Sequence, residues 1–257
     1  MQKTIIITVA GVSSRFNSGF KDSHLKAIYF EEKPTETLLF KILEKCKDAD
    51  SIIVVGGYKY DELKNYIEKN LDESLKQKII LVYNEFFQKY TSGYSLSVGL
   101  QRAFEKNPAE IIFIEGDLDI DKNSFVEVLA AEKDVLTYTS LPIDSKKSVV
   151  VYRNAANKYR YAFNSSHGLL EINEPFYNIY NSGQCWKFKN IELLKTANEK
   201  FCAVNITDTN LGIIQRYFEN LSADEVELIH LKRWLNCNTR QDYKIAKKNW
   251  DDENEND

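Results

Sequence analysis

The chain has 257 residues, enough for one large domain or two small ones with a sizeable buried core. Its 43% hydrophobic and 12% aromatic content excludes a disordered or fibrous chain. The formal net charge is −4, but five acidic residues and no basic one lie in 251–257, so residues 1–250 carry +1 and lack the basic excess typical of proteins that bind duplex nucleic acid.

Short runs rich in β-branched residues recur through the first 140 residues, and such runs are typical of strands buried on both faces. They are Lys3–Val9, Ser51–Gly56, Lys78–Tyr83 and Glu110–Ile114. Between them, apolar residues recur at helical spacing, as at Leu38, Leu39, Ile42, Leu43 and Cys46. The alternation predicts an α/β fold with a Rossmann-like, mainly parallel sheet flanked by helices.

After Pro142 the segments become shorter, aromatic and alternating, which predicts an antiparallel, β-rich lobe at about 148–188. Its expected strands are Ser148–Arg153, Tyr159–Phe163 and Tyr180–Phe188, separated by turns at 164–166 and 173–175. The expected later elements are helices at about Asn190–Ala197 and Thr209–Phe218, a strand at Val226–His230 and a helix from about Gln241. We predict one domain over 1–250 and an acidic, flexible tail over 251–257.

The four cysteines and three histidines are scattered without metal-ligand spacing, so neither a zinc site nor a disulfide framework is predicted. No segment approaches the roughly 20 apolar residues of a membrane-spanning helix, and the apolar run at the N-terminus is too short for the core of a signal peptide. These features predict a cytoplasmic protein that binds neither membrane nor nucleic acid.

In open α/β sheets ligands bind beyond the carboxyl ends of the strands, so the loops that follow strands are informative. The first, Ala10 to Phe16 (AGVSSRF), has small residues that let backbone N–H groups approach phosphate oxygens. Arg15 and the later Lys26 add positive charge suited to a polyanion. The loop matches neither GxxxxGK[ST] nor GxGxxG, and an ordinary strand-to-helix turn with two solvated cations is the alternative.

A second loop, Glu115 to Asp121 (EGDLDID), follows a predicted strand directly. Carboxylates at a strand end favour Mg²⁺, which takes one or two carboxylates together with substrate phosphates. The alternative is an acidic cap for a helix near Asn123. Two further polar loops are Tyr90–Ser95 and 236–240. The alternatives to a binding role are that Ser95 is a helix cap and that 236–240 is a turn before the last helix.

The segment AGVSSRF, then Lys26, then Thr37-Leu38-Leu39 resembles the signature AGxGSRF…PKxL…PLL of the sugar-phosphate nucleotidyltransferases, a GT-A-like superfamily. Tyr90–Leu96 is similar to the tNxxSL segment of its phosphocholine cytidylyltransferase branch. Gly116-Asp117 is similar to the metal-binding GD, and residues 238–243 (NTRQDY) to the closing DTxxDl. Four motifs occur in the same order, which is more specific than any one match.

Three positions depart from the pattern, since Val12 replaces a glycine, Leu25 a proline and Asn238 an aspartate. Val12 can cover a nucleotide only if its φ is negative. Asn238 can ligate a metal only through its neutral carbonyl oxygen, which lowers metal affinity. Asp117 and Asp119 are retained, so the departures do not imply loss of activity.

The resemblance implies that a phosphorylated small molecule attacks the α-phosphorus of CTP with Mg²⁺ as cofactor, giving a CMP product and pyrophosphate. It further implies a phosphoglutamine-like or phosphocholine-like acceptor, a role in cell-surface polysaccharide modification, and a monomer or homodimer. The implied triphosphate ligands are Arg15 and Lys26. The implied base and ribose contacts are Ala10, Gly11, Val12, Ser13, Ser14, Ser92 and Ser95. The implied metal ligands are Asp117, Asp119 and Asn238, with Asn236 as the alternative to Asn238.

Other functions remain open. They are a sugar-1-phosphate nucleotidyltransferase that uses UTP or CTP, a silent nucleotide-binding protein, and a GT-A glycosyltransferase with Asp117-Leu118-Asp119 as a DxD motif, which leaves Arg15 and Lys26 unexplained. In the β-rich lobe, candidate acceptor contacts are Arg153, Arg160, Lys187, Tyr161, His167, Tyr180 and Trp186. Aromatic residues at strand spacing are, however, more often part of a core.

Overall fold

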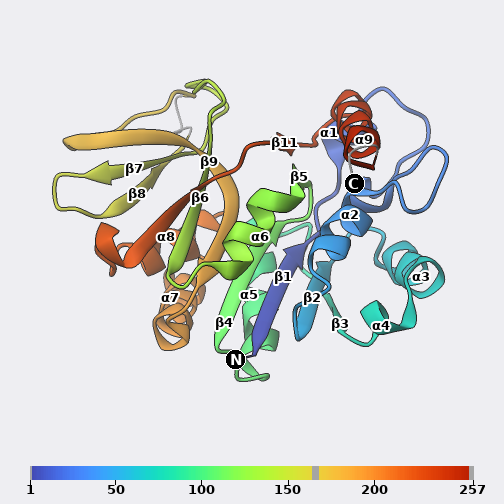
Figure 1. The fold of residues 1–257 in the computed structure, drawn as a ribbon, viewed down its shortest axis with the longest axis horizontal. Helices are drawn as coiled ribbons and strands as arrows, with labels where there is room; N and C mark the ends of the chain where they lie inside the picture. The colour runs from blue at the N-terminus through green and yellow to red at the C-terminus, as the bar shows by residue number, and fades with distance from the viewer. Residues whose placement is uncertain (1, 164–167, 255–257) are drawn as a thin grey trace.

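The computed structural model describes residues 2–163 and 168–254, and its centre is one twisted, nine-stranded sheet (Figure 1). The sheet contains all of the following strands except β5 and β11. The strands of the described residues are β1 (Lys3–Thr8), β2 (Ser51–Gly56), β3 (Ile79–Tyr83), β4 (Glu110–Glu115), β5 (Leu118–Ile120), β6 (Asp134–Thr139), β7 (Val150–Asn154), β8 (Tyr159–Ala162), β9 (Phe176–Phe188), β10 (Val226–His230) and β11 (Trp234–Asn236). The main path through the sheet is β10-β6-β9-β4-β1-β2-β3, and β5 and β11 form a separate antiparallel pair.

Helices cover both faces of this sheet (Figure 1). They are α1 (Ser14–Asn17), α2 (Leu38–Lys45), α3 (Tyr60–Asn70), α4 (Glu73–Lys76), α5 (Ser92–Phe104), α6 (Lys122–Ala130), α7 (Ile191–Val204), α8 (Leu211–Phe218) and α9 (Arg240–Asn254), with 3₁₀ turns η1 (Lys26–Ile28) and η2 (Ala223–Glu225). The buried face of α5 packs with α7 and α8 on one side of the sheet, while α2, α3 and α6 pack on the other.

The parallel half of the sheet follows from the β-branched runs of the sequence. β1 lies between β2 and β4, with Ile6 paired to Ile53 on one side and to Phe113 on the other. All three side chains are completely buried, as expected for strands covered on both faces. The predicted α/β class and mainly parallel sheet are therefore confirmed, and the carboxyl ends of β1 and β4 lie at the same edge.

The β-rich lobe is connected to the central sheet through the long strand β9 (Figure 1). One end of β9 lies antiparallel between β4 and β6, and its other end pairs with β7, which pairs in turn with β8. The predicted lobe strands correspond to β7, β8 and β9. The predicted turn at 164–166 and His167 lie outside the described residues.

Two candidate acceptor residues of the lobe are in fact part of the central core, because β9 continues into the main sheet. Trp186 stacks on Phe113 with ring centroids 5.2 Å apart. Lys187 is 1% exposed and forms an ion pair of 3.1 Å with Glu110. Burial lowers the pKa of Lys187, and the Glu110 carboxylate opposes that effect. The acceptor-binding predictions for Trp186 and Lys187 are therefore wrong.

The remaining lobe candidates also have structural partners. Tyr161 accepts a hydrogen bond of 2.7 Å from the indole N–H of Trp186, and Tyr180 packs on the ring of Tyr138. Arg160 forms an ion pair with Glu219, and Arg153 lies over the ring of Tyr177. None of these four lines the cavities described below.

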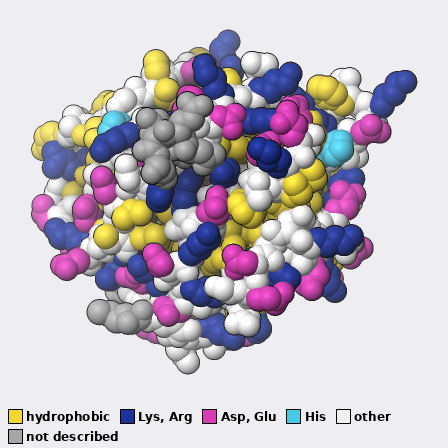
Figure 2. All heavy atoms as spheres, turned by 45° about the vertical axis from the view of Figure 1, so that its right-hand side comes forward, with side chains coloured by type: hydrophobic (Ala, Val, Ile, Leu, Met, Phe, Trp, Pro, Cys, Tyr) yellow, Lys and Arg dark blue, Asp and Glu magenta, His cyan; other side chains and the backbone are white. Residues whose placement is uncertain are grey.

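The last helix, α9, begins at Arg240 and continues to Asn254, so the first four residues of the predicted tail extend this helix. Its buried residues Tyr243, Ala246 and Trp250 pack in one cluster with Phe16 and Leu38. No helix within the described ranges is both long and apolar enough to span a membrane. On the face that Figure 2 shows, positive and negative side chains are intermixed.

Candidate functional site

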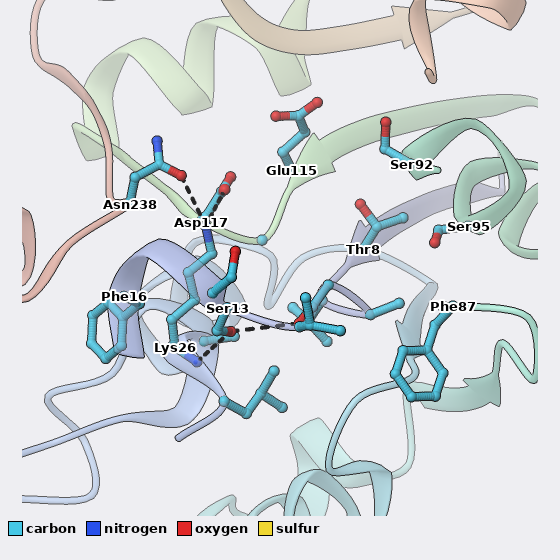
Figure 3. Close-up of a pocket in the computed structure, with 18 of the residues that line it drawn as sticks. Thr8, Ser13, Phe16, Lys26, Phe87, Ser92, Ser95, Glu115, Asp117 and Asn238 are labelled. Atoms are coloured by element: carbon cyan, nitrogen blue, oxygen red, sulfur yellow. Dashed lines mark hydrogen bonds and ion pairs between the residues drawn. The ribbon is translucent and has the colours of Figure 1, made fainter. Parts of the chain in front are cut away.

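Two adjoining cavities open at the carboxyl ends of β1 and β4. The first has a volume of about 400 Å³ and is lined by the loop after β1, the start of α5 and the end of β4 (Figure 3). The second, the lobe cavity, has a volume of about 640 Å³ and lies toward β9, β11 and the start of α8. Both cavities are lined by Arg15, Ser92, Glu115, Asp117 and Asn238. The two cavities are therefore adjacent, and ligands bound in them would lie side by side.

The loop after β1 forms one wall of the first cavity, and all of Ala10 to Arg15 line it. Ser13 adopts the left-handed conformation with φ of 55°, and its Oγ accepts a hydrogen bond of 3.2 Å from the backbone N–H of Lys26. The positive φ therefore falls on Ser13 and not on Val12, which is 43% exposed. Val12 therefore avoids the positive φ that would prevent a valine from covering a nucleotide here.

Gly116 places Asp117 beside this loop. A Cβ at Gly116 would lie 2.3 Å from the side chain of Val9 and 2.8 Å from the carbonyl oxygen of Thr8. Only glycine allows β4 to end this close to β1, since both contacts are shorter than real Cβ atoms show. The backbone N–H of Cys237 donates to the Asp117 carbonyl at 2.8 Å, which brings the loop after β11 to the same point.

Lys26, Asp117 and Asn238 form the polar centre between the cavities (Figure 3). Lys26 Nζ donates to Asp117 Oδ2 at 2.6 Å and to Asn238 Oδ1 at 3.2 Å. The other carboxylate oxygen, Asp117 Oδ1, is buried and has no hydrogen-bond partner among the described residues. An unpaired buried carboxylate oxygen is costly, so this atom is suited to a cation that arrives with a ligand.

The donor set at this centre fits Mg²⁺. Asp117 and Asn238 each offer an oxygen, and Mg²⁺ commonly binds one or two protein oxygens together with substrate phosphates and water. No group of three or more His, Cys, Asp or Glu side chains suited to a metal occurs in the described parts of the chain. A cation here would therefore depend on the phosphates of its substrate for most of its ligands.

Asn236 lies next to Asn238 and is hydrogen-bonded to it. Asn238 Nδ2 donates to Asn236 Oδ1 at 2.7 Å, so the Asn238 oxygen faces Lys26 and Asp117. The sequence left Asn236 and Asn238 as alternative ligands. The structure brings Asn238 next to Asp117.

Asp119 does not belong to this centre. It is 1% exposed, and its carboxylate accepts hydrogen bonds from Trp250 Nε1 at 2.9 Å and from Asn249 Nδ2 at 3.1 Å. Arg233 forms an ion pair of 3.2 Å with it. Because these partners occupy its oxygens and it lines neither cavity, the predicted role of Asp119 as a metal ligand is wrong.

Glu115 is a site residue that the sequence reasoning missed. It ends β4, lines both cavities and accepts a hydrogen bond from Asn210 Nδ2. Burial, with the adjacent Asp117 charge, raises the pKa of Glu115 to about 7. Ser92 Oγ in turn accepts a hydrogen bond of 3.2 Å from the Asn210 backbone N–H. The position of Glu115 in the sequence could have identified it, because it is the last residue of a buried strand and begins the acidic run.

Ser95 lines the first cavity from the start of α5, opposite the polar centre (Figure 3). Its Oγ accepts a hydrogen bond of 3.0 Å from Asn84 Nδ2, while Asn84 Oδ1 accepts one from the Phe86 backbone N–H. Asn84 immediately follows β3, so the expectation that ligands bind beyond the carboxyl ends of strands would have identified it. The neighbouring Gly93 packs closely against another segment, since a Cβ there would lie 2.3 Å from the carbonyl oxygen of Asp208.

The lobe cavity has a different lining, composed mainly of lysine, amide and hydroxyl side chains. The polar residues that line only this cavity are Lys146, Lys147, Ser148, Asn181, Ser182, Gln184, Thr209, Asn210 and Asn236. The Thr209 hydroxyl is buried without a hydrogen-bond partner in the described structure. Such a surface suits an anionic, polar ligand. These residues come from four separate segments, and sequence spacing does not reveal that they meet.

Three solved structures with a similar fold are named as transferases or a pyrophosphorylase that act with CTP or UDP-glucose. The chain is similar to a CTP:phosphocholine cytidylyltransferase from Streptococcus pneumoniae, with 14% identity, 97% of this chain and 100% of that chain covered, and a TM-score of 0.65. It is similar to an inositol-1-phosphate CTP transferase from T. maritima, with 14% identity, 96% of each chain covered and a TM-score of 0.66. It is also similar to a UDP-glucose pyrophosphorylase complexed with UDP-glucose, with 14% identity, 98% and 100% covered and a TM-score of 0.67.

These likenesses confirm the expected nucleotidyltransferase-like fold over nearly the whole chain. No curated protein matches the sequence. One family model matches residues 22–250, which include Lys26, Asp117 and Asn238. The chain therefore belongs to the family described as "Domain of unknown function (DUF6564)".

Proposed function

We propose that this protein is a nucleotidyltransferase that transfers CMP from CTP to a phosphorylated small molecule and releases pyrophosphate. The observation that carries the proposal is the buried, unpartnered Asp117 Oδ1, which lies beside Asn238 and Lys26 between two adjoining cavities. A transfer between two polyanions needs two neighbouring pockets and positive charge where they meet. The fold shared with nucleotidyltransferases supports the same reaction class.

In the proposed step, a phosphate oxygen of the acceptor attacks the α-phosphorus of CTP and forms a new P–O bond. The bond from the α-phosphorus to the bridging oxygen breaks, and pyrophosphate leaves with that electron pair. The acceptor is already an anion, so no general base is required. Asp117 and Asn238 would hold Mg²⁺, which supplies charge stabilisation when bound. Lys26 and the exposed Arg15 would bind the phosphates of CTP.

The contacts of Ser95 support a cytosine base. Because Ser95 Oγ already accepts a hydrogen bond from Asn84 Nδ2, its own proton remains for donation. Cytosine presents acceptors at O2 and N3, whereas N3 of uracil is a donor. A buried hydroxyl that donates to N3 therefore favours CTP over UTP. UTP with a sugar 1-phosphate acceptor is the second candidate, supported by the likeness to UDP-glucose pyrophosphorylase.

The acceptor would occupy the lobe cavity, where Lys146 and Lys147 are placed to attract its phosphate group. This placement replaces the expectation that Arg153, Arg160 and Lys187 bind the acceptor. The amide and hydroxyl groups of the lobe cavity would contact the rest of the molecule. Phosphoglutamine-like and phosphocholine-like acceptors are both to be tried, together with sugar and polyol phosphates.

The test is pyrophosphate release by the full chain with Mg²⁺, each of CTP, UTP, GTP and ATP, and a panel of phosphorylated acceptors. We expect release from CTP that depends on both Mg²⁺ and an acceptor, with one nucleotidylated product formed per pyrophosphate. A glycosyltransferase would instead release a nucleoside diphosphate from a nucleotide sugar. A silent nucleotide-binding protein would bind a triphosphate without turnover, and either outcome would overturn the proposal.

A further inference from the structure

Three amide side chains connect the lobe cavity to the polar centre through hydrogen bonds of fixed direction. Asn236 Nδ2 donates to Gln184 Oε1 at 3.3 Å, and Asn238 Nδ2 donates to Asn236 Oδ1 at 2.7 Å. Lys26 Nζ donates to Asn238 Oδ1 at 3.2 Å. Asn238 is therefore contacted from two sides, with its oxygen beside the Lys26 ammonium, which only donates, and its amide nitrogen beside the Asn236 oxygen, which only accepts.

Gln184, at the lobe-cavity end of this series of hydrogen bonds, has a strained backbone. Gln184 lies within β9 with φ of 54°, a left-handed conformation that costs a residue other than glycine about 1 kcal/mol or more. Its backbone N–H donates to Ser182 Oγ at 3.2 Å. Strain of this kind persists where the surroundings enforce it, and it is concentrated at functional sites. Gln184 and Asn236 both line the lobe cavity.

The orientation matters because position 238 is an asparagine. Only one of its two terminal atoms, Oδ1, can bind a cation, whereas either oxygen of a carboxylate can do so. An asparagine turned by 180° would direct Nδ2 toward Asp117 and lose the cation. We propose that Asn236 and Gln184 are positioning residues that hold the Asn238 oxygen toward the cation site. The inference rests on the proposed function in one respect, since it takes Asn238 as a cation ligand.

The first test uses Mn²⁺ with CTP as the probe, since water-proton relaxation reports the bound ion without turnover. In the full chain, we expect Asn236→Ala to weaken Mn²⁺–CTP binding about tenfold, the lower end of the range for partners that orient a metal ligand. Asn178→Ala is the matched control, because this asparagine of β9 accepts a hydrogen bond from Arg153 and lines neither cavity. It should bind Mn²⁺–CTP like the unmodified protein.

The second test separates orientation from general structural damage. In the double variant Asn236→Ala with Asn238→Asp, we expect Mn²⁺ binding to recover, because a carboxylate needs no neighbour to select its oxygen. If Asn236 serves only the fold, the double variant will bind as weakly as Asn236→Ala. Gln184→Gly should keep or raise the melting temperature by removing the backbone strain, while weakening Mn²⁺ binding.

Wild-type Mn²⁺ binding in both Asn236→Ala and Gln184→Gly would overturn the positioning role. Asp117→Asn distinguishes this failure from failure of the proposed function. If Asp117→Asn also binds Mn²⁺–CTP normally, the cation site is elsewhere and both proposals fail. If Asp117→Asn loses the ion while the other two variants keep it, only the positioning role is wrong.

Discussion

Trp250 donates its indole N–H to Oδ1 of Asp119 at 2.9 Å, and this contact fixes α9 against the short strand β5. Arg233 and Asn249 also donate to the same carboxylate. Asp117, two residues earlier, instead lines both cavities. The two aspartates of one acidic loop therefore have separate environments, one inside the fold and one at the cavities.

This difference predicts that alanine at position 119 lowers stability, whereas alanine at position 117 lowers activity. Asp119→Ala should lower the free energy of unfolding by about 3 kcal/mol or more, because it removes a buried carboxylate that accepts from Arg233, Asn249 and the Trp250 indole N–H. Asp117→Ala should change the melting temperature much less, because it loses the Lys26 pair but also removes the buried Oδ1 that lacks a partner among the described residues. It should raise the activation free energy of pyrophosphate release by several kcal/mol. Thermal unfolding and turnover of both variants test this, and equal losses of stability would contradict it.

The two cations of the first cavity should differ in their effect on stability. Lys26 begins η1 and pairs with Asp117, whereas Arg15 is exposed. Arg15→Ala should weaken triphosphate binding with no change in melting temperature. Lys26→Ala should weaken binding and also lower stability by about 1 kcal/mol, since it leaves the Asp117 charge unpaired. Calorimetry with CTP and thermal unfolding check both effects, and normal CTP binding in both variants would exclude a phosphate-binding loop.

The raised pKa of Glu115 predicts a pH-dependent gain in stability for Glu115→Gln. Burial and the Asp117 charge raise this pKa to about 7 from its ordinary 4.5. Between these values the unfolded chain releases a proton that the folded protein retains, so stability falls as pH rises through this range. Glutamine still accepts from Asn210 but carries no charge. In metal-free buffer the variant should exceed the wild type by about 1–3 kcal/mol at pH 8 and by less at pH 5, as measured by urea unfolding. An equal difference at both pH values would contradict the assignment.

The Ser95 hydroxyl predicts which nucleotide binds. We expect CTP to bind more tightly than UTP, and both more tightly than GTP or ATP, in calorimetry with Mg²⁺. Ser95→Ala should reduce the preference for CTP over UTP by about 1 kcal/mol, because it removes the donor. Ser97→Ala is a suitable control, since Ser97 lies on the same helix, is fully buried and contacts Cys202 instead. Tighter binding of a purine would contradict the pyrimidine assignment.

The sequence alone determined the alternation of strands and helices and the loops that carry chemistry. Continuous β-branched runs such as Ile5 to Ile7 are stable only where both faces of a strand are buried, so a run of this kind indicates an interior parallel strand. Polar residues directly after such runs then fall at one edge of the sheet. That local logic was enough to select the loop of Arg15, together with Lys26 and Asp117.

Only the tertiary structure decided which of the polar residues share that edge and which are internal. Asp117 and Asp119 have the same chemistry and nearly the same position in the chain, but α9, far away in sequence, packs Trp250 against only one of them. The strand carrying Lys187 could have belonged to the lobe or to the main sheet, because both give the same alternation of side chains. Pairing between β9 and β4 placed it in the core, and such long-range pairing leaves no signal in local sequence.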